Sequence, residues 1–193
     1  MYEKRLTYWH LSLVGDAPAA PFLLAATKDL RAYGESQGYR SIPIGYSATD
    51  TAVLRPYLQD YLACRPNASE QLDFFALNSY EWCGTDTSFE ISGYQALEES
   101  FQGYPIPLFF SETGCNTVPP RDFADQEAIF GPEMSDTWSG AIIYEWIQEV
   151  NDYGLISYGP QAQGADDGTS VVQGYAYSSS FCLYVWFAKL LAR

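Results

Sequence analysis

Four short apolar segments recur along the chain at intervals of about thirty residues, and this alternation limits the fold more than any other feature. Each is short and nearly continuously apolar, as buried strands are. They span residues 41–46, 72–78, 107–111 and 140–146. Apolar residues at helical spacing predict helices over residues 22–33, 54–62, 94–104 and 123–130. Strands that alternate with amphipathic helices predict an α/β fold with a parallel, helix-covered sheet.

Polar and aromatic residues follow each predicted strand, at 46–50, 78–82, 112–116 and 144–148. Right-handed crossovers bring the carboxyl ends of parallel strands to one edge of the sheet, which is where a (β/α)8 barrel carries its active site. A complete barrel needs eight strands and typically ~250 residues, whereas this chain has 193. Either a doubly wound open sheet or half of a barrel is therefore expected. Beyond Gly154 we expect a loop with one weak strand at 171–172.

Charge and composition exclude several functional classes. The chain has 24 acidic and 10 basic side chains, which leaves no basic stripe for nucleic acid. His10 is the single histidine, glycine-rich phosphate motifs are absent, and the four cysteines lack C-x-x-C spacing. We therefore expect no metal, no cofactor and no nucleic-acid partner. Carboxylates and 17% aromatic residues remain, the chemistry typical of carbohydrate enzymes.

Glu112 directly follows the apolar segment 107–111, where a carboxylate is costly to bury without a partner. It could be a catalytic group or, with equal weight, a structural ion pair or helix cap. Tyr144 and Glu145 are adjacent on a predicted strand, so they should face opposite ways and only one should point into a barrel.

The cluster Tyr80, Glu81 and Trp82 allows two interpretations. Its aromatic rings could form a sugar-stacking platform, or they could close the top of the core. The residues alone do not distinguish these alternatives.

Four motifs resemble the fungal β-1,3-glucanosyltransferases of glycoside hydrolase family 72. They are Ile-Gly-Tyr-Ser-Ala-Thr-Asp at 44–50, Phe-Phe-Ala-Leu-Asn-Ser-Tyr-Glu-Trp-Cys-Gly at 74–84, Pro-Leu-Phe-Phe-Ser-Glu-Thr-Gly-Cys-Asn at 107–116 and Gly-Pro-Glu-Met-Ser-Asp-Thr-Trp-Ser-Gly at 131–140. The resemblance implies a partial (β/α)8 TIM barrel, strands five to eight with their helices, at residues 16–175. Residues 1–15 and 176–193 match nothing in the family, so the chain resembles the C-terminal half of a catalytic domain with foreign ends.

The resemblance also implies a function. Family members are retaining enzymes, GPI-anchored at the plasma membrane and cell wall, that cut β-1,3-glucan internally and pass the new reducing end to another glucan chain. Glu112 would be the nucleophile, and Tyr80 and Tyr144 would line the donor site. β-1,3-Glucan would be the partner, with membrane attachment only through an anchor that is not in this chain. The N-terminal residues 1–20 do not read as a signal peptide.

Cysteines and a glycosylation motif carry further expectations. The resemblance implies that Cys83 and Cys115 pair and brace the nucleophile's loop. Cys64 resembles a cysteine whose partner lies beyond this chain's end, and Cys182 does not match that partner. The sequon at Asn67 predicts N-glycosylation if the protein is secreted.

One departure from the family pattern concerns the acid/base glutamate. Alignment from Asp16 puts this residue near Ser12, where no glutamate stands. Loss of proton transfer typically costs about 10²–10⁴-fold in rate, and half a barrel leaves two open sheet edges. We therefore expect the isolated chain to be inactive or unstable. Two alternatives are a non-catalytic β-glucan-binding protein that keeps its aromatic platforms, and a fragment without function.

Overall fold

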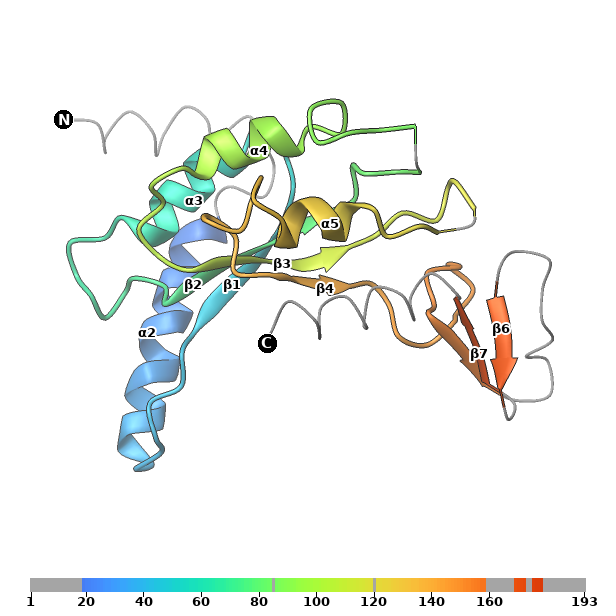
Figure 1. Cartoon of the computed structure of the whole chain (residues 1–193). Coiled ribbons are helices and arrows are strands. Elements are labelled where there is room, and N and C mark those ends of the chain that lie inside the picture. The colour runs from blue at the N-terminus through green and yellow to red at the C-terminus, as the bar shows by residue number, and fades with distance from the viewer. Residues whose placement is uncertain (1–18, 85, 120, 159–168, 173–174, 179–193) are drawn as a thin grey trace. The chain divides into compact units, whose positions relative to one another are not determined.

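A computed structural model describes residues 19–84, 86–119 and 121–156, and the backbone of 157–158, 169–172 and 175–178. The elements are α2 (Ala20–Ser36), β1 (Gly45–Thr49), α3 (Arg55–Ala63), β2 (Phe74–Ser79), α4 (Tyr94–Phe101), β3 (Leu108–Thr113), α5 (Asp125–Phe130), β4 (Ala141–Ile143), β5 (Ile156–Tyr158), β6 (Thr169–Val172) and β7 (Tyr175–Ser178). Strands β1 to β4 form one sheet in that order, and β4 pairs parallel with β3 (Figure 1). The predicted α/β fold with a parallel sheet is confirmed.

The chain divides into two compact units. Unit 1 contains Met1–Leu77 and Gly103–Phe109, and unit 2 contains Asn78–Gln102 and Phe110–Arg193. In unit 1, Leu24 on α2, Leu62 on α3 and Phe75 on β2 are all buried. The ring of Tyr104 meets Phe75 edge-on at 6.0 Å, and its hydroxyl donates to the carbonyl of Gln59 at 2.8 Å.

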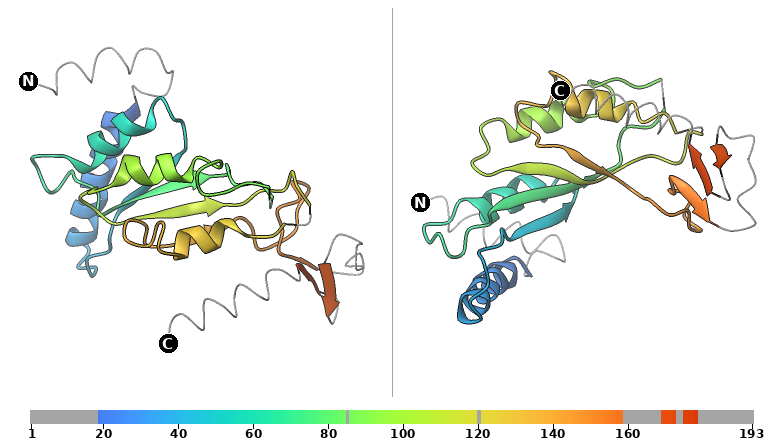
Figure 2. Two further views of the ribbon diagram at one scale, coloured as in Figure 1. Left: turned by 45° about the horizontal axis from the view of Figure 1, so that its top comes forward. Right: turned by 60° about the horizontal axis from the view of Figure 1, so that its bottom comes forward.

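The core of unit 2 is a stack of aromatic rings against β3. Phe110 is fully buried, with the ring of Trp138 stacked on it at 3.9 Å and that of Tyr94 at 5.5 Å. Phe101 meets Trp138 edge-on at 5.1 Å. Two of these four residues come from α4, which lies with α5 over one face of β3 (Figures 1 and 2). The aromatic core therefore places β3 firmly against its helices.

An irregularity in β3 decides which way its last residues point. Phe110 pairs with Ala141 and Thr113 with Ile143, so β3 uses one more residue than β4 over the same stretch. Phe110 and Thr113 are both fully buried, and Gln126 on α5 donates to the Thr113 hydroxyl at 3.0 Å. Because neighbouring strand residues face opposite ways, Glu112 points away from α5.

Strand β1 lies later in the sequence than predicted. The segment 41–46 was expected to be a strand and 47–50 a loop, but β1 spans Gly45–Thr49. β1 is an edge strand and buries only Ala48, so it has no continuous apolar run. The apolar pattern therefore favoured the segment 41–46 instead. Ile42 is exposed, and Pro43 has no backbone N–H to donate to a ladder.

The two ends of the predicted pattern also need correction. Strand β4 ends at Ile143 rather than at 146, because the next carbonyl, that of Tyr144, accepts from Arg121 at 2.9 Å instead of continuing a ladder. The strand expected at 171–172 is present within β6, but the expected loop around it also contains β5 and β7, and the three form an antiparallel sheet in the order β5-β7-β6. Their mixed polar and aromatic residues lack the continuous apolar character of the four parallel strands.

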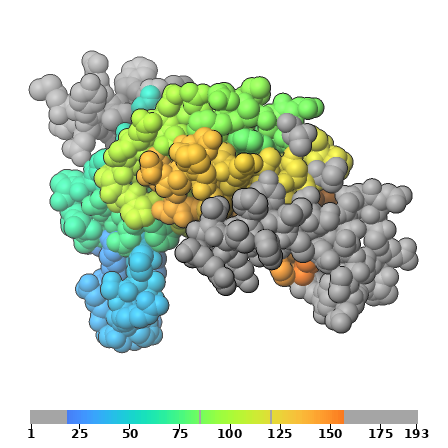
Figure 3. All heavy atoms as spheres, in the orientation of Figure 1, coloured from blue at the N-terminus to red at the C-terminus, as the bar shows by residue number. Residues whose placement is uncertain are grey.

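Helix α2 carries large apolar side chains that are exposed, among them Phe22, Leu30 and Tyr33. Its carboxyl-terminal end projects from the rest of unit 1 (blue in Figure 3). Within the described residues, every helix is either too short or too polar to cross a bilayer.

Asp73 connects three segments of unit 1. Its Oδ2 accepts from the backbone N–H of Ile44 at 2.7 Å and from Nη2 of Arg31 on α2 at 2.7 Å, while Arg31 Nη1 donates to the carbonyl of Ser69 at 2.8 Å. Burial raises the pKa of Asp73, but the Ile44 hydrogen bond and Arg31 outweigh it, so the pKa lies below its ordinary value. The charged carboxylate therefore stabilises the fold above the unfolded pKa of about 4, and this contribution is lost as the pH falls.

We predict that Asp73→Asn lowers the free energy of unfolding by about 0.5–1 kcal/mol at pH 7, since the side chain is 43% exposed and solvent screens the pair. The difference should shrink as the pH falls below about 4 and through the lowered pKa of folded Asp73, and it should be smallest at about pH 2. Urea denaturation at both pH values measures this, with Asp29→Asn on the exposed part of α2 as the matched control. An equal loss at both pH values contradicts the assignment.

Candidate active site at the carboxyl ends of β2, β3 and β4

Three side chains predicted from the sequence come together in unit 2. Tyr80 follows β2, Glu112 is the penultimate residue of β3, and Tyr144 follows β4. The Tyr80 hydroxyl donates a hydrogen bond to Oε2 of Glu112. The rings of Tyr80 and Tyr144 meet edge-on with centroids 6.3 Å apart. Glu112, for which an ion pair was an open alternative, is instead a half-buried carboxylate held by a phenol.

A third tyrosine completes the group, and the sequence analysis missed it. Tyr153 lies between β4 and β5, with its ring 5.6 Å from that of Tyr80 and 5.4 Å from that of Tyr144, both edge-on. We call Tyr80, Tyr144 and Tyr153 the tyrosine cluster. Tyr153 belongs to a loop, so no strand or helix period marked it; its place just before Gly154 in a polar turn is the only signal it offered.

The environment of Tyr80 keeps its hydroxyl protonated, so that it can donate a hydrogen bond. Burial raises the pKa of Tyr80 far above its ordinary value, and the hydrogen bond to Glu112 and the charge of that carboxylate raise it further. The pKa of Tyr144 is also raised, first by the charge of Glu145 and then by burial and the charge of Glu112. Both phenols are therefore neutral near pH 7 and can donate hydrogen bonds to a carboxylate or to a sugar oxygen.

Tyr144 and Glu145 approach the same partner, which corrects the expectation that they face opposite ways. Nδ2 of Asn151 donates to Oε1 of Glu145 at 2.7 Å and lies 3.4 Å from the Tyr144 hydroxyl. Strand alternation does not apply to them because β4 ends at Ile143. Asn116 in turn donates to the backbone carbonyl of Asn151 at 2.6 Å, so an amide network supports this side of the site.

Of the cluster 80–82, only Tyr80 faces Glu112. Trp82 packs edge-on against the buried Tyr94, with ring centroids 5.4 Å apart, so it belongs to the core of unit 2. Glu81 is exposed, and one of its oxygens accepts from the hydroxyl of Ser79. The core-closing interpretation therefore holds for Trp82, whereas Tyr80 lies beside Glu112 and its sugar-stacking role stays a prediction.

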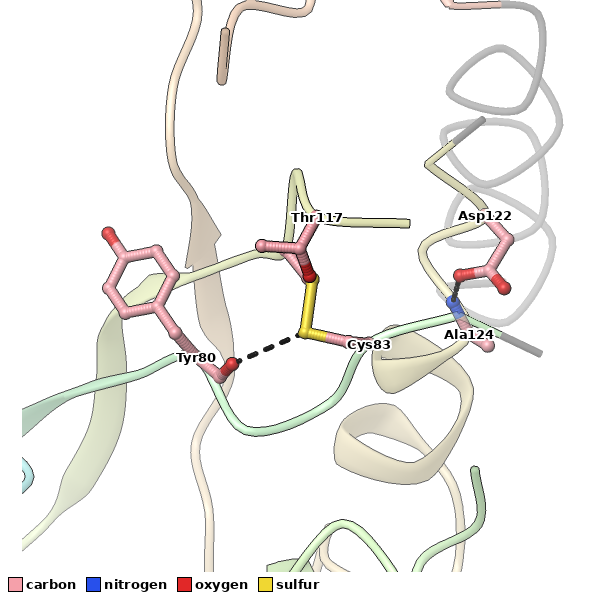
Figure 4. The surroundings of a disulfide bond; sticks show 6 residues. Tyr80, Cys83, Thr117, Asp122 and Ala124 are labelled. Atoms are coloured by element: carbon pink, nitrogen blue, oxygen red, sulfur yellow. Dashed lines mark hydrogen bonds between the residues drawn. A yellow bond between two sulfur atoms is a disulfide. The ribbon is translucent and has the colours of Figure 1, made fainter. Parts of the chain in front are cut away.

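A disulfide joins the loops that follow Tyr80 and Glu112. Cys83 and Cys115 are bonded, with Cα atoms 5.3 Å apart, which confirms the pairing implied by the family resemblance (Figure 4). Cys83 Sγ lies 3.7 Å from the backbone carbonyl oxygen of Tyr80, and the hydroxyl of Thr117 lies 3.1 Å from Cys115 Sγ. Each cysteine of the disulfide therefore lies three residues after a member of the hydrogen-bonded pair, Cys83 after Tyr80 and Cys115 after Glu112. Cys64 carries an exposed free thiol, and Cys182 lies outside the described residues.

Arg121 links two members of the tyrosine cluster through their backbones. Its guanidinium donates to the carbonyls of Tyr144, at 2.9 Å, and of Tyr153. Nothing in the sequence pattern distinguished it from other loop arginines. Over the described part of the chain, no group of three or more His, Cys, Asp or Glu side chains is arranged to hold a metal ion.

Glu112 and the tyrosine cluster lie at the carboxyl edge of a parallel sheet, which is where α/β enzymes carry their active sites. The chain belongs to the glucanosyltransferase family: the Glyco_hydro_72 family model, described as glucanosyltransferase, matches residues 13–176.

Curated relatives and a solved structure show the same similarity. The chain is 45% identical over 162 residues to pH-responsive protein 2 of Candida albicans, covering 84% of this chain and 28% of that protein. It is 44% identical over 138 residues to 1,3-beta-glucanosyltransferase GAS2 of Saccharomyces cerevisiae, covering 72% and 24%. A mutant of Saccharomyces cerevisiae Gas2p, solved in complex with laminaritetraose and laminaripentaose, matches with a TM-score of 0.74 and 38% identity, covering 89% of this chain and 36% of that one. The chain thus spans about a quarter to a third of the length of these relatives.

We predict that replacing both Cys83 and Cys115 by serine lowers the free energy of unfolding by about 3–4 kcal/mol, because the crosslink closes a loop with a sequence separation of 32. Urea denaturation with and without a phosphine reductant measures the effect. The reductant should destabilise the wild type and a Cys64→Ser control, but not the double variant. A double variant as stable as the oxidised wild type would refute a bracing role.

We also predict that Glu112→Gln lowers the pKa of Tyr80, because it removes the acceptor charge that opposes phenolate formation. Spectrophotometric titration should show one tyrosine that ionises at a lower pH than in the wild type, although burial, the largest cause, still holds the pKa of Tyr80 above its ordinary value. Glu81→Gln is the matched control, since Glu81 is exposed and does not contribute to the shift at Tyr80. Identical titration curves for wild type and Glu112→Gln would contradict the pairing.

Proposed function

We propose that this chain carries the nucleophile side of a retaining β-1,3-glucanosyltransferase site, with Glu112 as the nucleophile. The observation that supports this most directly is the hydrogen bond from Tyr80 to Oε2 of Glu112 at the carboxyl edge of the sheet. A phenol that occupies one oxygen orients the carboxylate and leaves the other oxygen for attack.

The four parallel-sheet strands correspond, in this proposal, to strands five to eight of a (β/α)8 barrel. Support comes from the order β1-β2-β3-β4, which follows the chain as barrel strands do, and from the match to about a third of the solved Gas2p chain. Glu112 would then end the seventh barrel strand.

The chemistry proceeds in two displacement steps. The free oxygen of Glu112 attacks the anomeric carbon of a glucan, the glycosidic bond to the departing chain breaks, and that chain's oxygen takes a proton from a second carboxyl group about 5–5.5 Å from the nucleophile. A hydroxyl of an acceptor glucan then attacks the glycosyl-enzyme, loses its proton to the same second group and releases Glu112. Two inversions at the anomeric carbon retain its configuration.

β-1,3-Glucan is the proposed substrate. Several relatives are named 1,3-beta-glucanosyltransferases, and the Gas2p structure contains laminari-oligosaccharides. Tyr80 and Tyr144 would contact the donor glucan through their rings and neutral hydroxyls. By the same family resemblance, the protein would be located at the fungal cell surface and in the cell wall. Asn67, exposed in the loop between α3 and β2, would be an N-glycosylation site there.

The second carboxyl group is the part that this 193-residue chain does not supply at the aligned position near Ser12, which lies outside the described residues. Formation of a glycosyl-enzyme from a donor whose leaving group needs no proton requires only the nucleophile. The isolated chain should therefore react with such an activated donor while failing to transfer natural glucan.

We predict that a laminaribiosyl donor with a dinitrophenolate leaving group, and with fluorine on the carbon next to the anomeric centre to slow turnover, labels Glu112. Peptide mass mapping should find one disaccharide on the peptide that contains Glu112. Glu112→Gln should remain unlabelled, whereas the matched variant Glu81→Gln should be labelled like the wild type. With reduced laminari-oligosaccharides, none of these proteins should give transfer products.

Three results would contradict the proposal. Label on another residue, or label that persists in Glu112→Gln, removes the nucleophile assignment. Binding of laminari-oligosaccharide without any label supports a non-catalytic glucan-binding protein. Transfer products from the isolated wild-type chain that vanish in Glu112→Gln would show that its proton donor is present after all.

A further inference from the structure

We propose that Arg121 is the positioning residue that holds the tyrosine cluster around Glu112. The inference rests on the proposed function, because it assigns a role within the same site. Arg121 does not contact Glu112; it acts through the backbones of Tyr144 and Tyr153.

The contacts of Arg121 are those of a brace between two loop segments. Nη2 donates to the carbonyl of Tyr144 at 2.9 Å, and Nη1 donates to the carbonyl of Tyr153. The guanidinium carbon also lies 4.9 Å from the ring centroid of Phe123 and 5.6 Å from that of Tyr153. A planar fork with several donors can serve both carbonyls at once while its faces lie against rings, which an ammonium group cannot reproduce.

The end of β3 is shaped to admit this side chain. Gly114 follows Thr113 directly and has a φ of 153°. A Cβ atom on Gly114 would lie 2.7 Å from Nη2 of Arg121 and 3.1 Å from the Tyr144 carbonyl oxygen. Glycine at this position, two residues after Glu112, therefore leaves room for the guanidinium to reach the Tyr144 backbone.

Arg121 remains charged in this setting. Burial lowers its pKa, and the nearby carboxyl of Asp125 acts in the opposite direction. Guanidinium groups do not lose their proton in proteins, so the hydrogen bonds to the two carbonyls are charge-assisted. Their loss would leave two partly buried carbonyls without this donor and release the segments that carry Tyr144 and Tyr153.

The rings of those two segments define the surroundings of Tyr80. Tyr144 and Tyr153 each meet the Tyr80 ring edge-on, at 6.3 and 5.6 Å, and Tyr80 in turn bonds Glu112. Arg121 is thus separated from the nucleophile by two layers of contact, the backbone carbonyls and the tyrosine rings. Removal of Arg121 should therefore loosen Tyr80 without substituting any residue that is proposed to contact the donor glucan.

Arg121→Met and Arg121→Lys test the inference in the full chain. We expect Arg121→Met to bind laminaripentaose about tenfold more weakly in calorimetry, and Arg121→Lys to recover part of the loss. Tetranitromethane should nitrate Tyr80 several-fold faster in Arg121→Met. Phenolate is the reacting form, and loss of a nearby positive charge alone would slow nitration, so acceleration reports a loosened ring.

Arg31→Met is the matched control, because Arg31 also donates to a loop carbonyl but belongs to unit 1, whereas the tyrosine cluster belongs to unit 2. It should leave laminaripentaose affinity and Tyr80 nitration unchanged, whatever it does to stability. If Arg121→Met does not fold, Gly114→Ala, which displaces the guanidinium, replaces it with the same expectations.

Unchanged Tyr80 nitration in the Arg121 variant overturns the inference, and so does unchanged laminaripentaose affinity in a chain whose wild type binds. A wild type that binds no laminaripentaose counts against the proposed function instead. In that case the nitration rates still decide the role of Arg121: faster nitration supports it and an unchanged rate rejects it.

Discussion

The hydrogen bond between the Tyr80 hydroxyl and the Glu112 carboxylate is the interaction on which the account of this protein depends. It joins the end of β2 to the end of β3, and it turns a costly half-buried charge into a stabilised and oriented group. A half-buried carboxylate needs a hydrogen-bond donor beside it. Tyr80 supplies that donor because burial and the carboxylate itself keep its pKa high.

Other features of unit 2 support that bond from different directions. The stacked rings of Tyr94, Phe110 and Trp138 hold β3 against α4, and the extra residue before Thr113 directs Glu112 to the opposite face. A disulfide ties the two loops that leave the site. The site is therefore built from rigid elements on one side and from braced loops on the other, as preorganised catalytic groups require.

The sequence predicted the parts of the site that lie at strand ends. Apolar runs mark strands and parallel strands end at one edge, which put Glu112, Tyr80 and Tyr144 together, and the family resemblance then singled out the two tyrosines. Tyr153 and Arg121 could not be found in this way, because loop conformation, not periodicity, brings them to the site. The same limit explains the misplaced β1, whose edge position requires only one buried residue, and the wrong expectation for Glu145, which assumed that β4 continues past Ile143.

The central claim is that Glu112 faces a bound β-1,3-glucan as its attacking group. A crystal structure of this chain with a bound laminari-oligosaccharide tests it most directly. The account predicts an anomeric carbon about 3–3.5 Å from the Glu112 oxygen that Tyr80 does not occupy, with the rings of Tyr80 and Tyr144 in contact with the sugar. An oligosaccharide bound away from Glu112, or a Glu112 side chain turned from the tyrosine cluster, would contradict it.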